Sequence, residues 1–228
     1  MISYSYSYLV GDLVLLVIWL ILFFWRKDTR REMVHISFLF GIIGLIVDPV
    51  YAMDWWKAAT MTGTMPGIES FLFGFATAGI ASVIYAELFN KKVKIKKIKK
   101  INLNLLSLLL LGTILFFGSV FILKLNSFQA SFPALLIPTG IIWIKRKDLI
   151  INSIISGALL ILISFVAYLI PEYFYPGLLN VIWNFEILSG IKIFGVVIED
   201  LIWFFMAGLL IGPLYEYWQE GKLINIRN

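Results

Sequence analysis

The amino-acid sequence predicts an all-α membrane protein with seven transmembrane helices. Hydrophobic residues make up 61% of the 228 residues and charged residues 14%, whereas a soluble domain is nearer half apolar. The apolar residues gather in long runs, and runs of about 18 or more residues indicate helices that cross a bilayer. Most Lys and Arg residues lie in alternate connections between these runs, which is typical of a polytopic membrane protein.

The first three predicted helices are separated by polar and basic connections. The first, over 8–25, is followed by the basic run RKDTRR. The second, over 35–53, contains Asp48–Pro49, a pair that can cap a kink. The third, over 68–89, is followed by KKVKIKKIKK. We expect this lysine run to anchor the helix ends at an anionic inner leaflet and not to bind nucleic acid.

Four further helices complete the prediction. They cover 103–123, 131–144, 149–170 and 193–214. The fifth is followed by KRK, so that 16 of the 19 basic residues lie on one side of the membrane. The positive-inside rule makes that side cytoplasmic, which puts the N-terminus outside and the C-terminus inside.

The sequence lacks several kinds of functional motif. It has no cysteine and a single histidine, His35. This removes disulfides, cysteine-based zinc sites and cysteine nucleophiles, and we expect no metal site. No glycine-rich nucleotide-binding loop occurs either. The basic residues behind the net charge of +5 lie in short loops, where they set the orientation of the helices in the membrane. We therefore expect no nucleic-acid partner.

The two halves of the chain resemble each other. IESFLFGFATAGIASVIY at 68–85 aligns without a gap with IEDLIWFFMAGLLIGPLY at 198–215, and WRKD at 25–28 corresponds to IKRKD at 144–148. The first pair is offset by 130 residues and the second by about 120 residues. Helices one to three therefore correspond to helices five to seven, as parallel repeats joined by helix four.

This repeat predicts the organisation of the chain. We expect one transmembrane domain over 1–228, built from a first repeat at 1–90, a linker helix at 91–125 and a second repeat at 126–220. A site between such halves would draw carboxylates from both. Small residues such as Gly74, Gly208 and Gly212 favour close helix packing there.

Five acidic residues lie toward the outer half of the predicted helices and would form a layer at similar depth. They are Asp12, Asp48, Glu69, Glu199 and Asp200. An ionised acid at the bilayer centre costs at least about 2.5 kcal/mol. Burial favours the neutral carboxylic acid, and two adjacent acids tend to share a proton. One of Glu199 and Asp200 is therefore expected to be able to donate a proton.

Aromatic side chains surround these acids. Trp203 and Phe204 follow Glu199 and Asp200, and two phenylalanines, Phe71 and Phe73, follow Glu69. A buried carboxylic acid can protonate a carbon–carbon double bond, aromatic faces stabilise the resulting cation, and a second carboxylate can remove a proton. Aromatic residues also fill helix interfaces, so this pattern by itself identifies no substrate.

The chain resembles the small integral-membrane lycopene β-cyclases, of the type that occurs as two subunits, as a fused chain or joined to phytoene synthase. The resemblance lies in two acidic motifs, MPGIESFLFGF at 65–75 and GVVIEDLIWFF at 195–205, and in the preceding segments DWW at 54–56 and IWNF at 182–185. The first motif has Ser70 where a second acid is usual. The second has Val197 where a proline would fall.

The resemblance implies redox-neutral cyclisation of the ψ-end of lycopene to a β-ionone ring, by an intramolecular lyase or isomerase that uses no cofactor. It implies an integral protein of the cell membrane whose partners are lycopene and the lipid bilayer. The implied catalytic residues are Glu199, Asp200 and Glu69. The expected substrate-binding residues are Trp203, Phe204, Phe71, Phe73 and Asp48.

Other functions remain open from the sequence. A carotenoid hydratase or another isoprenoid-modifying enzyme would share the chemistry. A non-catalytic seven-helix protein that binds pigment or lipid, or a proton-linked transporter, would share the architecture. A retinal protein is disfavoured because Lys192 lies at the outer end of the last helix and not at its middle. The sequence leaves a homodimer open as well.

Overall fold

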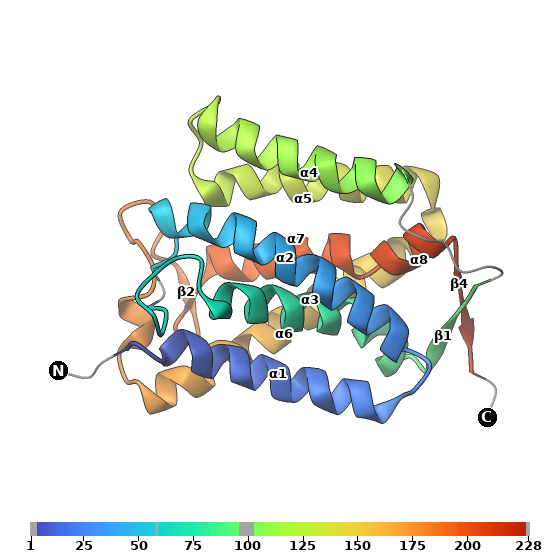
Figure 1. Cartoon of the computed structure of the whole chain (residues 1–228), viewed down its shortest axis with the longest axis horizontal. Coiled ribbons are helices and arrows are strands. Elements are labelled where there is room, and N and C mark those ends of the chain that lie inside the picture. Colours follow the sequence, from blue (N-terminus) through green and yellow to red (C-terminus); the bar gives the residue numbers. More distant parts are fainter. Residues whose placement is uncertain (1–3, 58, 96–102, 227–228) are drawn as a thin grey trace.

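The computed structural model of the chain describes residues 4–57, 59–95 and 103–226 (Figure 1). The helices are α1 (Ser7–Trp25), α2 (Arg30–Asp54), α3 (Ile68–Leu88), α4 (Leu103–Phe121), α5 (Ser127–Lys145), α6 (Ile150–Phe174), α7 (Ile198–Ile211) and α8 (Leu214–Gln219). The short turns η1 (Lys147–Leu149) and η2 (Leu178–Asn180) flank α6. Two antiparallel pairs of strands join β1 (Lys91–Lys94) to β4 (Lys222–Asn225) and β2 (Lys192–Ile193) to β3 (Val196–Val197).

Seven segments of the described chain are long and apolar enough to cross a membrane, as the sequence predicts. Six of them correspond to α1 to α6, and the seventh runs from Ile198 to Gln219 and comprises α7 and α8 together. The predicted all-α membrane fold is therefore confirmed. The lysine run at 91–100 is described only as far as Ile95: Lys91–Lys94 form β1, and 96–100 lie outside the described residues.

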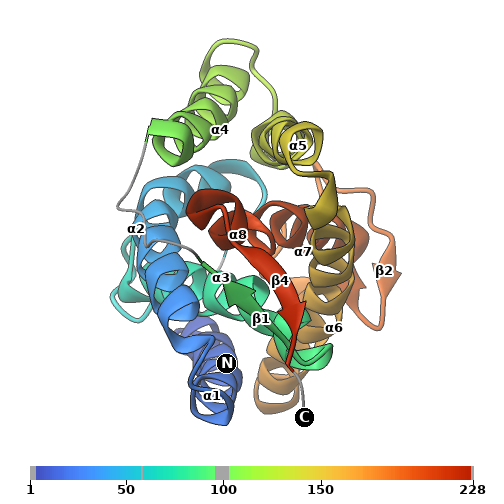
Figure 2. The ribbon, with the colours of Figure 1, turned by 90° about the vertical axis from the view of Figure 1, so that its right-hand side faces the viewer.

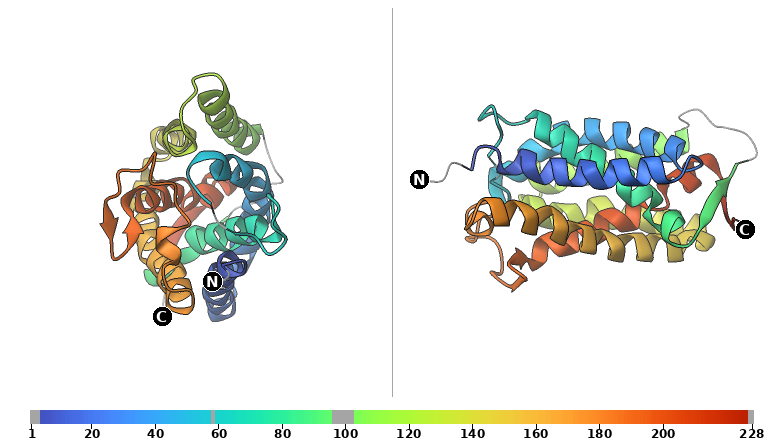
Figure 3. Two further views of the ribbon diagram at one scale, coloured as in Figure 1. Left: turned by 90° about the vertical axis from the view of Figure 1, so that its left-hand side faces the viewer. Right: turned by 90° about the horizontal axis from the view of Figure 1, so that it is seen from below.

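The helices run along the long axis of the molecule, and the two termini lie at opposite ends (Figure 1). Seen from either end, α3 and α7 lie near the centre, while α4 is outermost beside α5 (Figures 2 and 3). The burial of the helices agrees: 78% of the α7–α8 segment and 56% of α3 is buried, against 22% of α4. The motif helices α3 and α7 thus form the core of the bundle.

Two predicted helix starts lie five residues from the starts in the structure. α2 begins at Arg30, five residues before the predicted start, which brings Glu32 into the helix and buries it. α7 begins at Ile198 and not at 193, because the β2–β3 hairpin occupies the preceding residues and Gly195 takes a φ of +87° in its turn. Glu199 therefore lies in the first turn of α7, whereas the sequence predicts it about two turns inside.

The end of α7 is determined by Pro213. Proline has no N–H to donate to the carbonyl four residues earlier, here that of Leu209. The hydroxyl of Ser153 on α6 donates to that carbonyl instead. The neighbouring Asn152 donates from Nδ2 to the carbonyl of Gly212 at 3.3 Å. Side chains of α6 thus satisfy the backbone where the last membrane span changes from α7 to α8.

Small residues bring helices close together inside each half, and not between the halves where the sequence predicts them. The Cα of Gly74 on α3 faces the backbone of α2 at Phe40, and that of Gly208 on α7 faces Gly157 on α6. A Cβ at either glycine would overlap the neighbouring backbone. α2 with α3 and α6 with α7 therefore form the two tight helix pairs of the bundle.

Two arginines make matching contacts at the end of the bundle where β1 and β4 pair. Arg26 and Arg146 each follow a helix, form a two-pronged ion pair with the acid two residues later, and donate to backbone carbonyls near the end of α3 or α8. For Arg26 the partners are Asp28 at 2.6 and 3.2 Å, Ala86 at 2.7 Å and Lys91 at 2.5 Å. For Arg146 they are Asp148 at 2.6 and 2.8 Å, Glu216 at 3.3 Å and Gly221 at 2.8 Å.

Candidate active site

Two carboxylates and a ring of aromatic side chains line one cavity in the core, here called the acid cavity. Its empty volume, including the part open to the outside, is about 330 Å³. Its lining residues are Tyr8, Asp48, Tyr51, Trp55, Trp56, Phe73, Tyr168, Asp200, Trp203 and Phe204. They come from α1, α2, α3, α6 and α7 and from the segment after α2, so the cavity is built by both halves of the chain.

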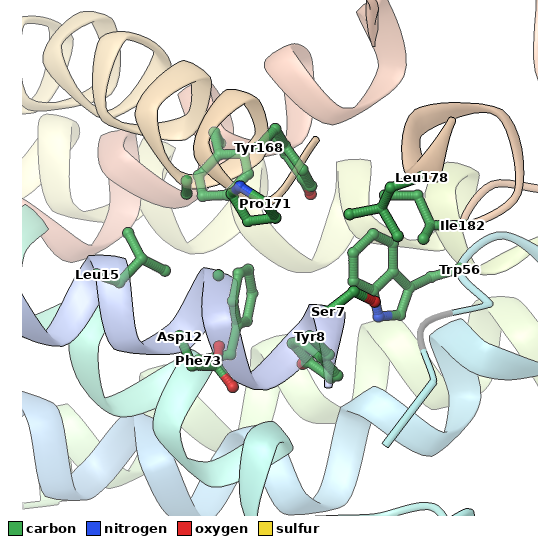
Figure 4. A pocket seen from close by; sticks show the side chains of 13 residues that line it. Ser7, Tyr8, Asp12, Leu15, Trp56, Phe73, Tyr168, Pro171, Leu178 and Ile182 are labelled. Atoms are coloured by element: carbon green, nitrogen blue, oxygen red, sulfur yellow. The ribbon is translucent and has the colours of Figure 1, made fainter. Parts of the chain in front are cut away.

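A second cavity adjoins the first and lies between α1 and α6 (Figure 4). This α1/α6 cavity has an empty volume of about 420 Å³, including the part open to the outside. Side chains of α1, including Asp12, lie on one side of it, with Tyr168 and Pro171 of α6 across from them. Five residues line both cavities, which therefore meet: Tyr8, Trp56, Phe73, Tyr168 and Phe204.

Asp48 is held in the acid cavity by two hydroxyl donors. Its Oδ2 accepts hydrogen bonds from the hydroxyl of Tyr8 at 3.1 Å and from that of Ser70 at 2.6 Å. Its side chain is buried, with 7% of the residue exposed. Ser70 aligns with Asp200 of the second motif, so the carboxylate beside this position comes from α2 and not from α3.

Asp200 has a comparable environment on the other wall. Its Oδ2 accepts a hydrogen bond from Trp183 Nε1 at 3.2 Å, and the Tyr168 hydroxyl also bonds to this carboxyl group. Tyr168 follows Asp48 by 120 residues and Asp200 follows Ser70 by 130 residues, which are the offsets of the sequence repeat. The acid lies on the first helix of the α2–α3 pair and on the second helix of the α6–α7 pair.

Glu69 and Glu199 have a different arrangement from the two aspartates. Oε1 of Glu69 accepts a hydrogen bond from the backbone N–H of Met61 at 2.6 Å, and Oε1 of Glu199 accepts one from Ser189 at 2.7 Å. Each glutamate thus ties the loop before its own helix to the first helical turn. Both are buried, and neither lines the acid cavity or the α1/α6 cavity.

Asp12 is the most isolated acid near the site. It lines the α1/α6 cavity with 1% of the residue exposed. Both of its carboxyl oxygens are buried and have no hydrogen-bond partner among the described residues. The sequence indicates that Asp12 belongs to the acidic layer but gives it no role, since its spacing alone does not show which side of α1 faces the core.

The aromatic residues singled out from the sequence divide into two groups. Phe73, Trp203 and Phe204 line the acid cavity. The ring centre of Phe73 lies 5.9 Å from that of Trp203 and 5.9 Å from that of Phe204. Phe71 instead packs against Phe38 at 6.3 Å, on the outer side of α3. Among the predicted substrate-binding residues, Phe71 alone is absent from the walls of the cavities described.

The loops preceding the two motifs pair with each other above the site. Trp56 and Trp183 form an antiparallel bridge, and the backbone N–H of Asn184 donates to the carbonyl of Trp55 at 3.0 Å. Trp55 and Trp56 line the acid cavity, with 4% of Trp55 exposed, because this pairing folds the segment after α2 over the core.

The fold and the site together define a polytopic helical membrane protein with carboxylates facing an internal aromatic cavity. Residues 126–218 match the model of the lycopene cyclase family. This segment runs from the start of α5 to α8 and includes Tyr168, Asp200 and Trp203. The match confirms the predicted family over this part of the chain and supports a carotenoid cyclase-like function. No curated protein and no solved structure matches the chain.

Proposed function

We propose that the chain converts the ψ-end of lycopene to a β-ionone ring, as a redox-neutral intramolecular lyase or isomerase. The observation that carries this proposal is the acid cavity, where Asp48 and Asp200 face one aromatic enclosure. The reaction needs a proton donor, a wall that tolerates a carbocation and a base. All three kinds of group lie around the joined cavities.

The reaction begins when a carboxylic acid protonates the terminal double bond of the substrate. Asp12 is suited to this step because no hydrogen-bond donor among the described residues stabilises its anion, and burial without a partner favours the neutral acid. The π electrons of the neighbouring internal alkene then attack the cation, which closes the six-membered ring. The positive charge moves to a ring carbon beside the aromatic walls.

Loss of a proton from the adjacent carbon completes the ring and its double bond. Asp48 and Asp200 are suited to accept this proton because hydroxyl or indole donors stabilise their charged forms. One proton is gained and one is lost, so no electron donor or acceptor is needed. The faces of Phe73, Trp203 and Phe204 stabilise the intermediate cation without reacting with it.

Glu199 and Glu69, the acids favoured by the family resemblance, have a supporting role in this scheme. Their hydrogen bonds to Ser189 and Met61 hold the loops that precede α7 and α3. Because Asp200 follows Glu199 directly and Ser70 follows Glu69, these anchors position the cavity groups. Their catalytic importance would then arise through Asp200 and through the Ser70–Asp48 pair.

The same proposal includes two parallel repeats, 1–90 and 126–220, joined by 91–125 in one domain at the cell membrane. The matched contacts of Arg26 and Arg146 support the repeat. The end of the bundle that carries these arginines would be cytoplasmic under the positive-inside rule, which puts the N-terminus outside.

Expression in a bacterial host that accumulates lycopene tests this function. Pigments are separated by chromatography and weighed by mass spectrometry, with an Asp48→Asn, Asp200→Asn double variant as the control. The wild type is expected to give a β-ring product whose mass equals that of lycopene and whose absorbance is shifted. The variant should not give this product. A product heavier by one water would indicate a hydratase. Unchanged lycopene with the protein in the membrane would leave a pigment-binding or transport protein.

A further inference from the structure

A third cavity, here called the tail cavity, lies between α2, α4, α5 and α7. Its empty volume, including the part open to the outside, is about 660 Å³. Aliphatic and aromatic residues form most of its wall, among them Ile43 and Val47 of α2 and Leu109 of α4. The wall contains no acidic or basic residue. Such a cavity suits a long hydrocarbon.

The few polar groups in the wall are already hydrogen-bonded. The Thr113 hydroxyl donates to the carbonyl of Leu109 at 2.9 Å. Trp203 Nε1 donates to the Tyr51 hydroxyl at 3.0 Å, and that hydroxyl pairs with Ser131 at 2.9 Å. A ligand in the tail cavity therefore meets no side-chain group that needs a polar partner, which favours an unfunctionalised chain over a lipid headgroup or a polar metabolite.

The tail cavity meets the acid cavity at two shared residues, Tyr51 and Trp203. Tyr51 lies on α2 one turn after Asp48, and Trp203 lies on α7 one turn after Asp200. These two hydrogen-bonded rings form the boundary between the cavities, so the tail cavity lies directly beyond them for a molecule whose end lies between the two aspartates. The α1/α6 cavity is a poorer place for a hydrocarbon tail, since it is smaller and holds the unpaired Asp12.

The helix that covers the tail cavity is α4, which the sequence assigns only to a linker. Gly112 of α4 lies against α5 where Pro138 cannot donate to the carbonyl of Ala134, and a Cβ on Gly112 would lie 3.1 Å from that carbonyl oxygen. This close contact closes the cavity on its outer side.

We infer that the tail cavity binds the unreacted polyene portion of the substrate, with α4 as its outer wall, while the terminal unit reacts in the acid cavity. This inference rests on the proposed function. It assigns a binding role to Leu109 and Ala134, and it predicts that the cavity matters only for substrates long enough to occupy it.

Neighbouring positions on α4 provide a matched test. Leu109 lines the cavity, whereas Leu110 is 51% exposed on the outer face. We compare Leu109→Trp with Leu110→Trp on lycopene and on an apolycopenal, which keeps one ψ-end but is truncated at the other. Leu109→Trp should lower the conversion of lycopene at least about tenfold and leave the apolycopenal reaction near the wild-type rate. Leu110→Trp should leave both reactions unchanged.

A second pair on α5, Ala134→Phe in the cavity and Leu136→Phe on the exposed face, repeats the comparison with different packing. Conversion of the apolycopenal shows that each variant is folded. The inference would be overturned if Leu109→Trp and Ala134→Phe each slowed the conversion of both substrates equally. It would also be overturned if neither variant affected either substrate. A length-dependent loss caused instead by Ala167→Phe in the α1/α6 cavity would overturn it as well. If the wild type converts neither substrate, the proposed function itself fails.

Discussion

Asp48 on α2 and Asp200 on α7 face the same cavity, although they belong to different halves of the chain. Each is bonded to a hydroxyl on the partner helix of its own tight pair, Asp48 to Ser70 on α3 and Asp200 to Tyr168 on α6. The two halves therefore contribute comparable acid–hydroxyl pairs with opposite placement. The site exists only where both halves meet.

We expect Asp48→Asn and Asp200→Asn to change the product as well as the rate. General-base catalysis contributes roughly 10²–10⁴-fold, and without the base the ring cation survives longer and loses a proton elsewhere or takes up water. Chromatography of the pigments should show other ring isomers or hydrated products. Ser70→Ala, which removes only one hydrogen bond to Asp48, should reduce the rate less. Wild-type product at the wild-type rate from both Asn variants would eliminate these aspartates as catalytic groups.

Asp12→Asn should abolish turnover without changing the product. An amide cannot supply the proton, so we expect a loss of at least about 10²-fold with lycopene left unreacted. The purified variant should still bind lycopene, because the cavity keeps its shape. A change in the absorbance of lycopene on binding would measure this. Asp12→Glu should recover part of the activity. A variant Asp12→Asn that cyclises lycopene normally would assign the proton donor to another acid.

Glu199 should respond differently to two substitutions. Glu199→Gln keeps an oxygen that can accept from the Ser189 N–H, so most of the activity and stability should remain. Glu199→Ala leaves that N–H without its partner, which costs about 1–3 kcal/mol when a buried group is involved. Thermal unfolding in detergent and lycopene conversion measure the two effects. If both variants instead lost all activity while Glu199→Gln kept the stability of the wild type, the carboxyl group of Glu199 would be catalytic.

Arg26 should make the stability of the protein depend on pH. The hydrogen bond from Arg26 lowers the pKa of Asp28, so the folded state binds a proton there less readily than the unfolded state. The ion pair therefore adds to the free energy of unfolding above the pKa that Asp28 has in the unfolded chain. This stabilisation is lost as the pH falls through the lower pKa of Asp28 in the folded protein. Arg26→Met should therefore reduce the melting temperature at neutral pH, and the difference from the wild type should shrink in acid. Lys27→Met, at an exposed neighbouring position, serves as the control, and a difference that persists unchanged in acid would contradict the assignment.

The helices could be predicted from the sequence because membrane spans follow from length and apolarity alone. The start of α7 could not, since the apolar residues 193–197 fit a helix or a strand equally well, and only the turn at Gly195 with its pairing selects the hairpin. The burial of Glu32 and Glu216 could not be predicted either, because α2 begins earlier than the sequence indicates and α8 lies against α6, where Asn152 donates to Glu216 at 2.9 Å.

The acidic layer could also be predicted, but not the grouping within it. Glu199 and Asp200 are adjacent in sequence, yet successive residues of a helix point about 100° apart, so one binds the loop and the other faces the cavity. The pairing of Asp48 with Ser70 depends on how α2 crosses α3. The wall positions of Trp55 and Trp56 depend on a long-range pairing with residues 182–184, for which the spacing of residues in one segment gives no signal.

The opposite placement of acid and hydroxyl in the two halves has a consequence for a symmetrical molecule. An unchanged duplication would have left two equivalent reaction centres, one for each end of the substrate. Here Ser70 and Tyr168 occupy the positions where two further carboxylates would complete such a pair, and a single centre remains. Lycopene has two identical ends, so it would have to leave, turn round and return before its second ring could close. The half-finished, one-ringed carotene should then build up early in the reaction and be released to the bilayer as a free intermediate.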